Sequence, residues 1–148
     1  MIIQNGDLAP AVQGLDVGHP HALVFYKASC SVTAMAGPAL ARLGDAYPGA
    51  VVAVGQDPAE VLDAFGGRHR WTFPQVSDLA PYEASNAYGI SSAPTVVVLD
   101  AEGRVADVVE SWDRDGMNRV SATLAGLLGA DPAVLSTPDD GLPAFKPG

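Results

Sequence analysis

The stretch VFYKASCSVTAMAGPAL, residues 24–40, contains the only cysteine of the chain, Cys30. Before it, Ala22 to Tyr26 form a short apolar run with branched and aromatic members, which is typical of a strand buried on both faces. After it, Ser31 to Ala46 carry small and aliphatic side chains at mainly helical spacing. Cys30 therefore lies where a strand gives way to a helix. Unpaired backbone N–H groups and the helix dipole stabilise a thiolate at such a junction, so the stretch predicts a nucleophilic thiol.

Further strands and helices follow in an alternating order. A second strand and helix are predicted first, then a polar connector and a short helix, then two strands joined by a turn, and a closing amphipathic helix. Asp57 and Pro58 are expected to open the second helix as its N-cap and first residue. The order is βαβα, a connector and ββα, which predicts one α/β domain. The expected ranges after the first helix are 50–54, 57–65, 81–88, 95–99, 104–110 and 118–128.

Composition limits the classes of function. The 148 residues are 48% hydrophobic, enough for one buried core. The net charge of −9 repels phosphate and anionic lipid, so we expect neither nucleic-acid nor membrane binding. The first residues do not resemble a signal peptide, and no window approaches the ~20 apolar residues of a spanning helix. We therefore expect a cytoplasmic protein, and a single cysteine fits a reducing compartment.

The last stretch has a different composition. Residues 130–148 contain four prolines and three aspartates and show no periodicity. We therefore divide the chain into a domain, residues 1–129, and a proline-rich tail, residues 130–148. The tail is expected to be extended on the surface or disordered, and to add little to the core.

Three separated blocks resemble the thioredoxin-like superfamily, specifically its TlpA/redoxin branch, which is related to AhpC/TSA peroxiredoxins. The resemblance implies a three-layer sandwich with a mixed central sheet between helices. It also implies a cis-proline loop beside the reactive cysteine. The matching residues are Phe25, Cys30 and 38–40 in the first block, Ala93-Pro94-Thr95 with VVVLDAEGRV in the second, and Gly6-Asp7-Leu8-Ala9-Pro10 with Gly14-Leu15-Asp16 at the start.

The resemblance also implies site residues. Cys30 matches the attacking cysteine of the family, and Thr33 occupies the position of the second cysteine of its C-x-x-C motif. An internal disulfide therefore cannot form, and an external thiol must resolve any mixed disulfide. Thr33 is expected to hydrogen-bond the Cys30 sulfur. The residues expected to cap the helix or bind a partner chain in extended form are Ser29, Ser31, Ala93, Pro94 and Thr95.

The favoured function is a monothiol thiol-disulfide oxidoreductase that acts on protein thiols or disulfides, or on glutathione, without a cofactor. One alternative is a one-cysteine peroxidase, although Lys27 and Leu23 stand where that family pattern has threonine and proline. Another is a redox-inactive interaction domain that keeps the fold. His19 and His21 lack a nearby third ligand in the sequence, so no metal site is predicted.

Overall fold

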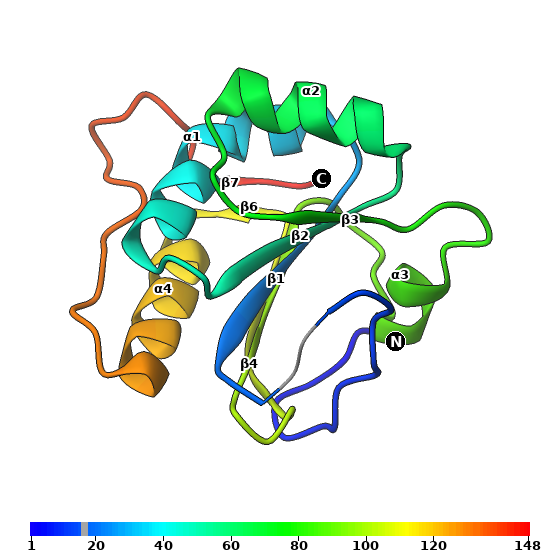
Figure 1. The fold of residues 1–148 in the computed structure, drawn as a ribbon. Helices are drawn as coiled ribbons and strands as arrows, with labels where there is room; N and C mark the ends of the chain where they lie inside the picture. Colours follow the sequence, from blue (N-terminus) through cyan, green and yellow to red (C-terminus); the bar gives the residue numbers. More distant parts are fainter. Residues whose placement is uncertain (16–17) are drawn as a thin grey trace.

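The computed structural model describes residues 1–15 and 18–148, so Asp16 of the expected N-terminal motif lies outside the described residues. Figure 1 shows a twisted sheet with helices packed around it. The strands are β1 His21–Tyr26, β2 Val51–Gly55, β3 Gln75–Ser77, β4 Thr95–Leu99, β5 Val105–Glu110, β6 Trp112–Asp113 and β7 Phe145–Lys146. The helices are α1 Ser31–Ala46, α2 Ala59–His69, α3 Glu83–Tyr88 and α4 Arg114–Leu128.

The main sheet has five strands in the order β3-β2-β1-β4-β5. β1 pairs parallel with β2 and antiparallel with β4, so the sheet is mixed. β1 is central and buried at all six positions, which explains its continuous apolar sequence. This is the three-layer thioredoxin-like architecture, and the predicted fold class is confirmed.

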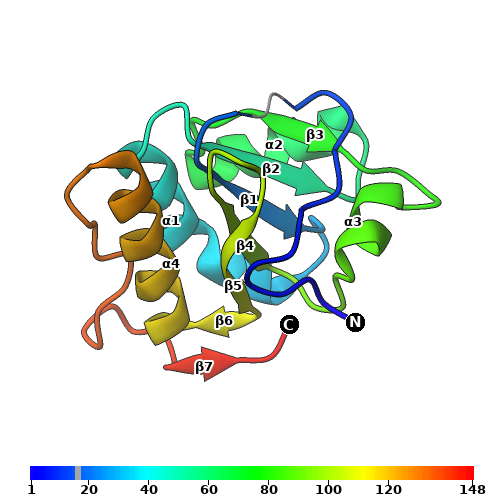
Figure 2. The same cartoon turned by 90° about the horizontal axis from the view of Figure 1, so that it is seen from below.

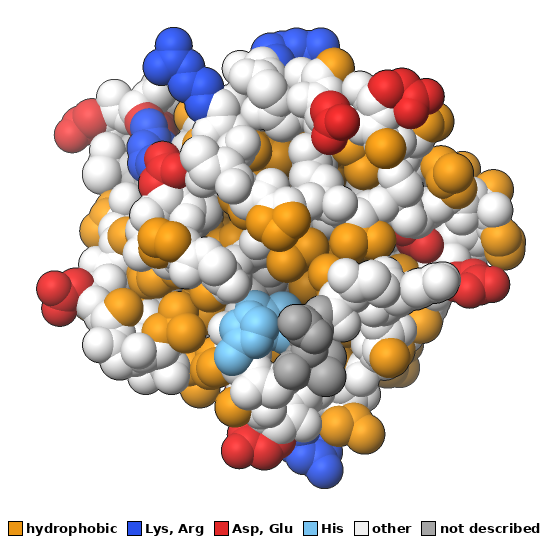
Figure 3. Space-filling view, viewed as in Figure 1, with side chains coloured by type: hydrophobic (Ala, Val, Ile, Leu, Met, Phe, Trp, Pro, Cys, Tyr) orange, Lys and Arg blue, Asp and Glu red, His pale blue; other side chains and the backbone are white. Residues whose placement is uncertain are grey.

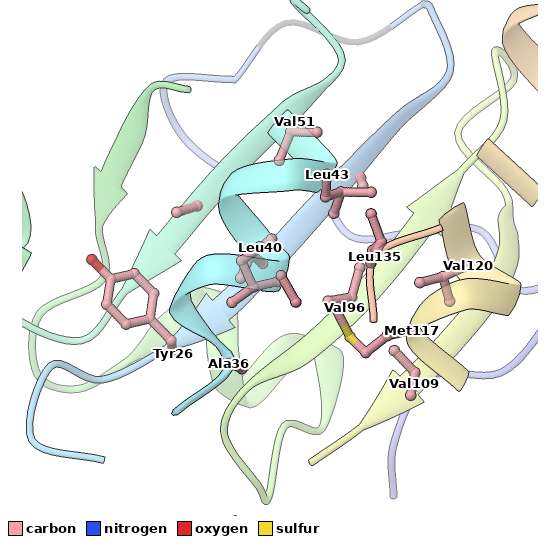
Figure 4. Close-up of a cluster of buried hydrophobic side chains, with 14 of the residues drawn as sticks. Tyr26, Ala36, Leu40, Leu43, Val51, Val96, Val109, Met117, Val120 and Leu135 are labelled. Atoms are coloured by element: carbon pink, nitrogen blue, oxygen red, sulfur yellow. The ribbon is translucent and has the colours of Figure 1, made fainter. Parts of the chain in front are cut away.

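Successive residues of the central strands face opposite sides of the sheet and supply two hydrophobic clusters. Ala22, Val24 and Tyr26 face the larger cluster, which α1, α2 and α4 cover. Leu23 and Phe25 face the smaller one, which contains Tyr88 at the end of α3 and residues of the N-terminal segment. Figure 4 shows α1 and α4 placing their apolar side chains over the same face of the sheet.

Two glycines of α1 let aromatic side chains approach the helix closely. A Cβ at Gly37 would lie 2.2 Å from Nδ1 of His69, and one at Gly44 would lie 2.3 Å from Phe73. Trp71 lies between these rings and donates from Nε1 to the carbonyl oxygen of Gly37 at 3.0 Å. This cluster fixes α1 against α2 and the loop that follows α2.

Some elements differ from the sequence prediction. β3 was not predicted, because three half-buried or exposed residues at a sheet edge carry no clear alternation. α4 begins at Arg114 instead of Asn118, because the Asp113 side chain accepts from Gly116 N at 3.1 Å and caps the helix.

The expectation that the tail adds little to the core is wrong. Leu135 is 1% exposed and belongs to the larger hydrophobic cluster, and Figure 4 shows it beside Val96 and Met117. Polar groups of the domain hold the backbone on both sides of it: Asn118 Oδ1 accepts from Leu135 N at 2.8 Å, and Arg42 donates to Leu135 O at 2.7 Å. The proline-rich composition concealed this anchor, because one buried leucine creates no periodic pattern.

The first prediction concerns this anchor. We expect Leu135→Ala to lower the free energy of unfolding by about 2–5 kcal/mol, since the change removes a buried side chain and leaves a cavity. Val134→Ala is the matched control, because Val134 is 65% exposed, and its effect should stay within about 0.5 kcal/mol. Urea unfolding of both variants measures the difference. Equal effects would show that the tail is not part of the core.

A second prediction concerns His69, whose Nε2 is buried without a hydrogen-bond partner in the described structure. Burial lowers the pKa of His69, and the charge of Arg68 lowers it further. The unfolded chain therefore binds the proton more readily, so this group's contribution to stability is present above pH 6.5 and is lost as the pH falls toward the folded-state pKa. Unfolding measured at about pH 7.5 and about pH 5 should show a smaller loss in His69→Phe than in the parent chain. An identical loss would contradict this account.

Candidate functional site

Cys30 lies between two elements of the domain. β1 ends at Tyr26, and α1 begins at Ser31 with Cys30 itself as the N-cap residue. Cys30 is half-buried, and its Sγ donates to the carbonyl oxygen of Ala93 at 3.4 Å. The sulfur therefore lies between the start of α1 and the loop that precedes β4.

The start of α1 is electropositive. Its first turn contains no acidic residue, and no side chain caps it. The partial positive charge of the helix terminus is therefore left to act on the adjacent sulfur. Ser29 and Ser31 flank Cys30 and are exposed, but neither makes the predicted cap. That expectation is wrong because Cys30 occupies the N-cap position.

The loop before β4 forms the other side of the site. The Ala93–Pro94 peptide bond is cis, and Pro94 O accepts from Ser111 N at 2.8 Å. Ala93 is half-buried and directs its carbonyl oxygen to the sulfur. Thr95 is fully buried and donates to Ser92 O at 2.8 Å. Its side chain therefore stabilises the loop from within the protein.

Thr33 differs from the expectation. Its side chain is 0% exposed, and within the described residues its hydroxyl has no hydrogen-bond partner. The expected Thr33–Cys30 hydrogen bond is absent, and the sulfur bonds to Ala93 O instead. The helical spacing places the two residues close together, but only the structure shows that Cys30 bonds to Ala93 O and that the Thr33 hydroxyl has no partner among the described residues.

Asp57 is a site residue that the sequence analysis did not identify. It does not cap α2, whose N-cap is Pro58, and Asp57 Oδ2 instead accepts from Ala28 N at 2.8 Å. The carboxylate therefore fixes the loop between β1 and Cys30. The sequence contained a signal for this contact. Ala28 follows β1 and Asp57 follows β2, and parallel neighbouring strands end at the same edge of a sheet.

A cavity of about 150 Å³ adjoins the Cys30 site. Lys27 and Gln56 line it, together with backbone and side chains of residues 90–93 and with Gly148 of the tail. Cys30 is not among the lining residues, but Ala93 belongs both to the cavity and to the cysteine site. The cavity is large enough for one side chain of a partner that lies across the Pro94 loop.

Two further expectations bear on ligands. His21 is buried, and its Nδ1 lies 2.8 Å from the carbonyl oxygen of His19. Among the described residues, no three His, Cys, Asp or Glu side chains form a group that could hold a metal ion.

Figure 3 shows the Lys and Arg side chains of one face scattered near its rim, without a continuous basic patch. Within the part of the chain that is described, no helix combines the length and apolarity needed to cross a bilayer.

Comparison with models of protein families shows to which family this chain belongs. The sequence profile of the AhpC/TSA family matches residues 11–108, about two-thirds of the chain. The chain belongs to the AhpC/TSA family. The matched part of this family member contains Cys30, Thr33 and the Pro94 loop. Comparison with curated protein sequences finds no match.

Solved structures show the same fold. The thioredoxin domain of a thiol-disulfide oxidoreductase from Bacteroides vulgatus is 20% identical, with a TM-score of 0.67 over 82% of this chain and 99% of that one. A secreted Mycobacterium tuberculosis disulfide oxidoreductase homologous to Escherichia coli DsbE is 22% identical, with a TM-score of 0.60 over 75% and 84%. The bacterioferritin comigratory protein of Xanthomonas campestris is 21% identical, with a TM-score of 0.59 over 76% and 80%.

The third prediction uses the unpaired hydroxyl of Thr33. Valine has nearly the same shape without the hydroxyl, so Thr33→Val should raise the free energy of unfolding by about 1 kcal/mol. Thr33→Ala is the control that also removes a methyl group, and it should destabilise the chain. Thermal or urea unfolding distinguishes the two. A loss of stability in Thr33→Val would show that the hydroxyl has a partner in solution.

Proposed function

We propose that this AhpC/TSA family member is a monothiol thiol-disulfide oxidoreductase of the cytoplasm, in which Cys30 forms mixed disulfides that an external thiol resolves. The observation that carries the proposal is the position of Cys30 Sγ, half-buried at an uncompensated helix N-terminus and 3.4 Å from Ala93 O of the Pro94 loop. The sequence contains no second cysteine, so resolution has to come from another molecule.

The chemistry takes two exchanges. The Cys30 thiolate attacks one sulfur of a partner disulfide, forms a Cys30–partner disulfide and releases the partner's other sulfur as a thiolate. An external thiol such as glutathione, after losing its proton, then attacks the partner's sulfur in that mixed disulfide. Cys30 leaves as a thiolate, and the oxidation passes to a disulfide between the partner and the external thiol. Each exchange breaks one S–S bond and forms one.

The α1 terminus favours both exchanges, because Cys30 is the attacking thiolate in the first and the leaving thiolate in the second. The Ala93 carbonyl oxygen accepts from the S–H group and would repel a thiolate. A partner backbone N–H that bonded to Ala93 O would weaken this repulsion. Binding of an extended partner across the Pro94 loop would therefore activate the sulfur at the moment it is needed.

The fourth prediction is a trapping experiment. The reduced protein is mixed with a disulfide of glutathione and with a cysteine peptide disulfide, and the products are identified by mass spectrometry after rapid acid quenching. We expect a disulfide at Cys30 from each reagent, released again by added glutathione. Cys30→Ser is the control and should form none. Failure of Cys30 to form either product in the folded protein would refute the proposed function and favour a redox-inactive interaction domain.

Family membership favours a second candidate, a one-cysteine peroxidase. In that reaction the Cys30 thiolate takes one oxygen from a peroxide to become a sulfenic acid, and the alkoxide released takes up a proton. Lys27 is exposed and Leu23 is buried at the positions where the peroxidase pattern has threonine and proline, so neither can supply that pattern's groups. Peroxide consumption measured on the same sample, with Cys30→Ser as the blank, separates the two reactions.

A further inference from the structure

The tail crosses the molecule and brings residues 145–148 to the cysteine site. From Gly129, after α4, it passes the buried Leu135 and returns as strand β7, which pairs with β6 just before α4. Figures 1 and 2 both show β7 beside β6, and Trp112 pairs with Lys146 in an antiparallel register. Residues 145–148 are thus an extended segment added beside the domain.

Gly148 lies against both sides of the cysteine site. A Cβ added to it would be 1.8 Å from the carbonyl oxygen of Ala93 and 3.4 Å from Cβ of Val32. Ala93 O is the acceptor for Cys30 Sγ, and Val32 is in the first turn of α1. Gly148 N also donates to Ser111 Oγ at 3.1 Å, and Ser111 N bonds to Pro94 O. The segment therefore lies where an extended partner would have to cross the Pro94 loop.

The tail is held unevenly along its length. Its root is fixed by the buried Leu135 and by Arg114, which donates to Ser136 Oγ and to Leu142 O. Trp112 Nε1 also donates to Pro143 O at 2.7 Å. Residues 143–148 are all exposed, and Phe145 is 57% exposed, so the end buries little apolar surface. The root keeps the end near the site, and the end is held there by backbone pairing with β6 and by the Gly148–Ser111 hydrogen bond instead of by buried apolar surface. Such an exposed segment opens more readily than the buried root.

We propose that residues 145–148 are an intramolecular occupant of the partner-binding face, and that a partner reaches Cys30 by displacing them. This regulation rests on the proposed function for its chemistry, but the occupancy does not depend on it. A tethered segment competes at high effective concentration, so a partner reaches Cys30 only if it binds the face strongly enough to displace residues 145–148. The tail thereby protects Cys30 from peptide and protein disulfides while leaving the sulfur open to small molecules.

Gly148→Leu tests the proposal, because a Cβ at this position would lie 1.8 Å from Ala93 O, so residue 148 has to move away from the Pro94 loop. The rate constant for reaction of Cys30 with an extended peptide carrying a thionitrobenzoate disulfide should rise about tenfold, as expected if the parent face is open about a tenth of the time. Alkylation by iodoacetamide should change by less than about twofold, because half-buried Cys30 is already accessible to a small reagent.

Two further variants make the result specific. Deletion of residues 145–148 keeps the whole root of the tail and should reproduce the gain of Gly148→Leu. Gly126→Leu is the matched control, since a Cβ at Gly126 meets nothing within 4 Å, and it should change neither rate. If the peptide rate of both displaced variants stays within about twofold of the parent chain while iodoacetamide reacts normally, the proposal is overturned.

A binding experiment without redox chemistry separates this proposal from the proposed function. In a Cys30→Ser background, a free peptide of residues 144–148, AFKPG, should shift the backbone amide resonances of Val32, Ala93 and Ser111 in the chain lacking residues 145–148. Its affinity for the chain that retains them should be about tenfold weaker. Equal affinity for the two chains, or no shifts in the shortened one, would overturn the occupancy even if Cys30 is fully reactive.

Discussion

The antiparallel pairing of β4 with β1 is the constraint on which the site depends. Phe25 is opposite Thr95 in this pairing, so the residues before β4 lie next to the residues after β1. The Pro94 loop and the start of α1 are thus brought together although more than sixty residues separate them in the chain. A shift of one residue in this register would exchange the side chains that one of the two strands presents to the two hydrophobic clusters, so packing of the core stabilises the geometry of the site.

The surroundings of Cys30 combine two opposing electrostatic effects. The partial positive charge of the helix terminus and the partial negative charge of the Ala93 carbonyl oxygen both lie close to the sulfur. Asp57 accepts from Ala28 N and so fixes the loop between β1 and Cys30. Among the described residues, it makes no hydrogen bond to the sulfur. In the proposed mechanism, a partner that binds to Ala93 O changes this balance, which links partner binding to chemistry.

The tail connects stability with access to the site. Leu135 and the hydrogen bonds of Arg114 make its root part of the domain, whereas its last residues are exposed and lie at the cysteine. In the proposed regulation, the root keeps residues 145–148 close to the site, while a partner can still displace them. Composition alone describes the tail as a uniform polar and proline-rich extension, but its two halves have different physical roles.

The sequence by itself determined the order of the main elements, the α/β class and the place of Cys30 at a strand-to-helix junction, because apolar runs, helical spacing and turn residues are local signals. The thioredoxin-like fold came from the family resemblance, which also indicated the Pro94 loop. Only the tertiary structure decided that the sulfur bonds to Ala93 instead of Thr33, that Asp57 holds Ala28, and that Leu135 and Gly148 tie the tail to the core and the site. Each of these is a contact between residues distant in the chain or a choice among nearby hydrogen-bond partners, and such choices leave no periodic pattern in the sequence.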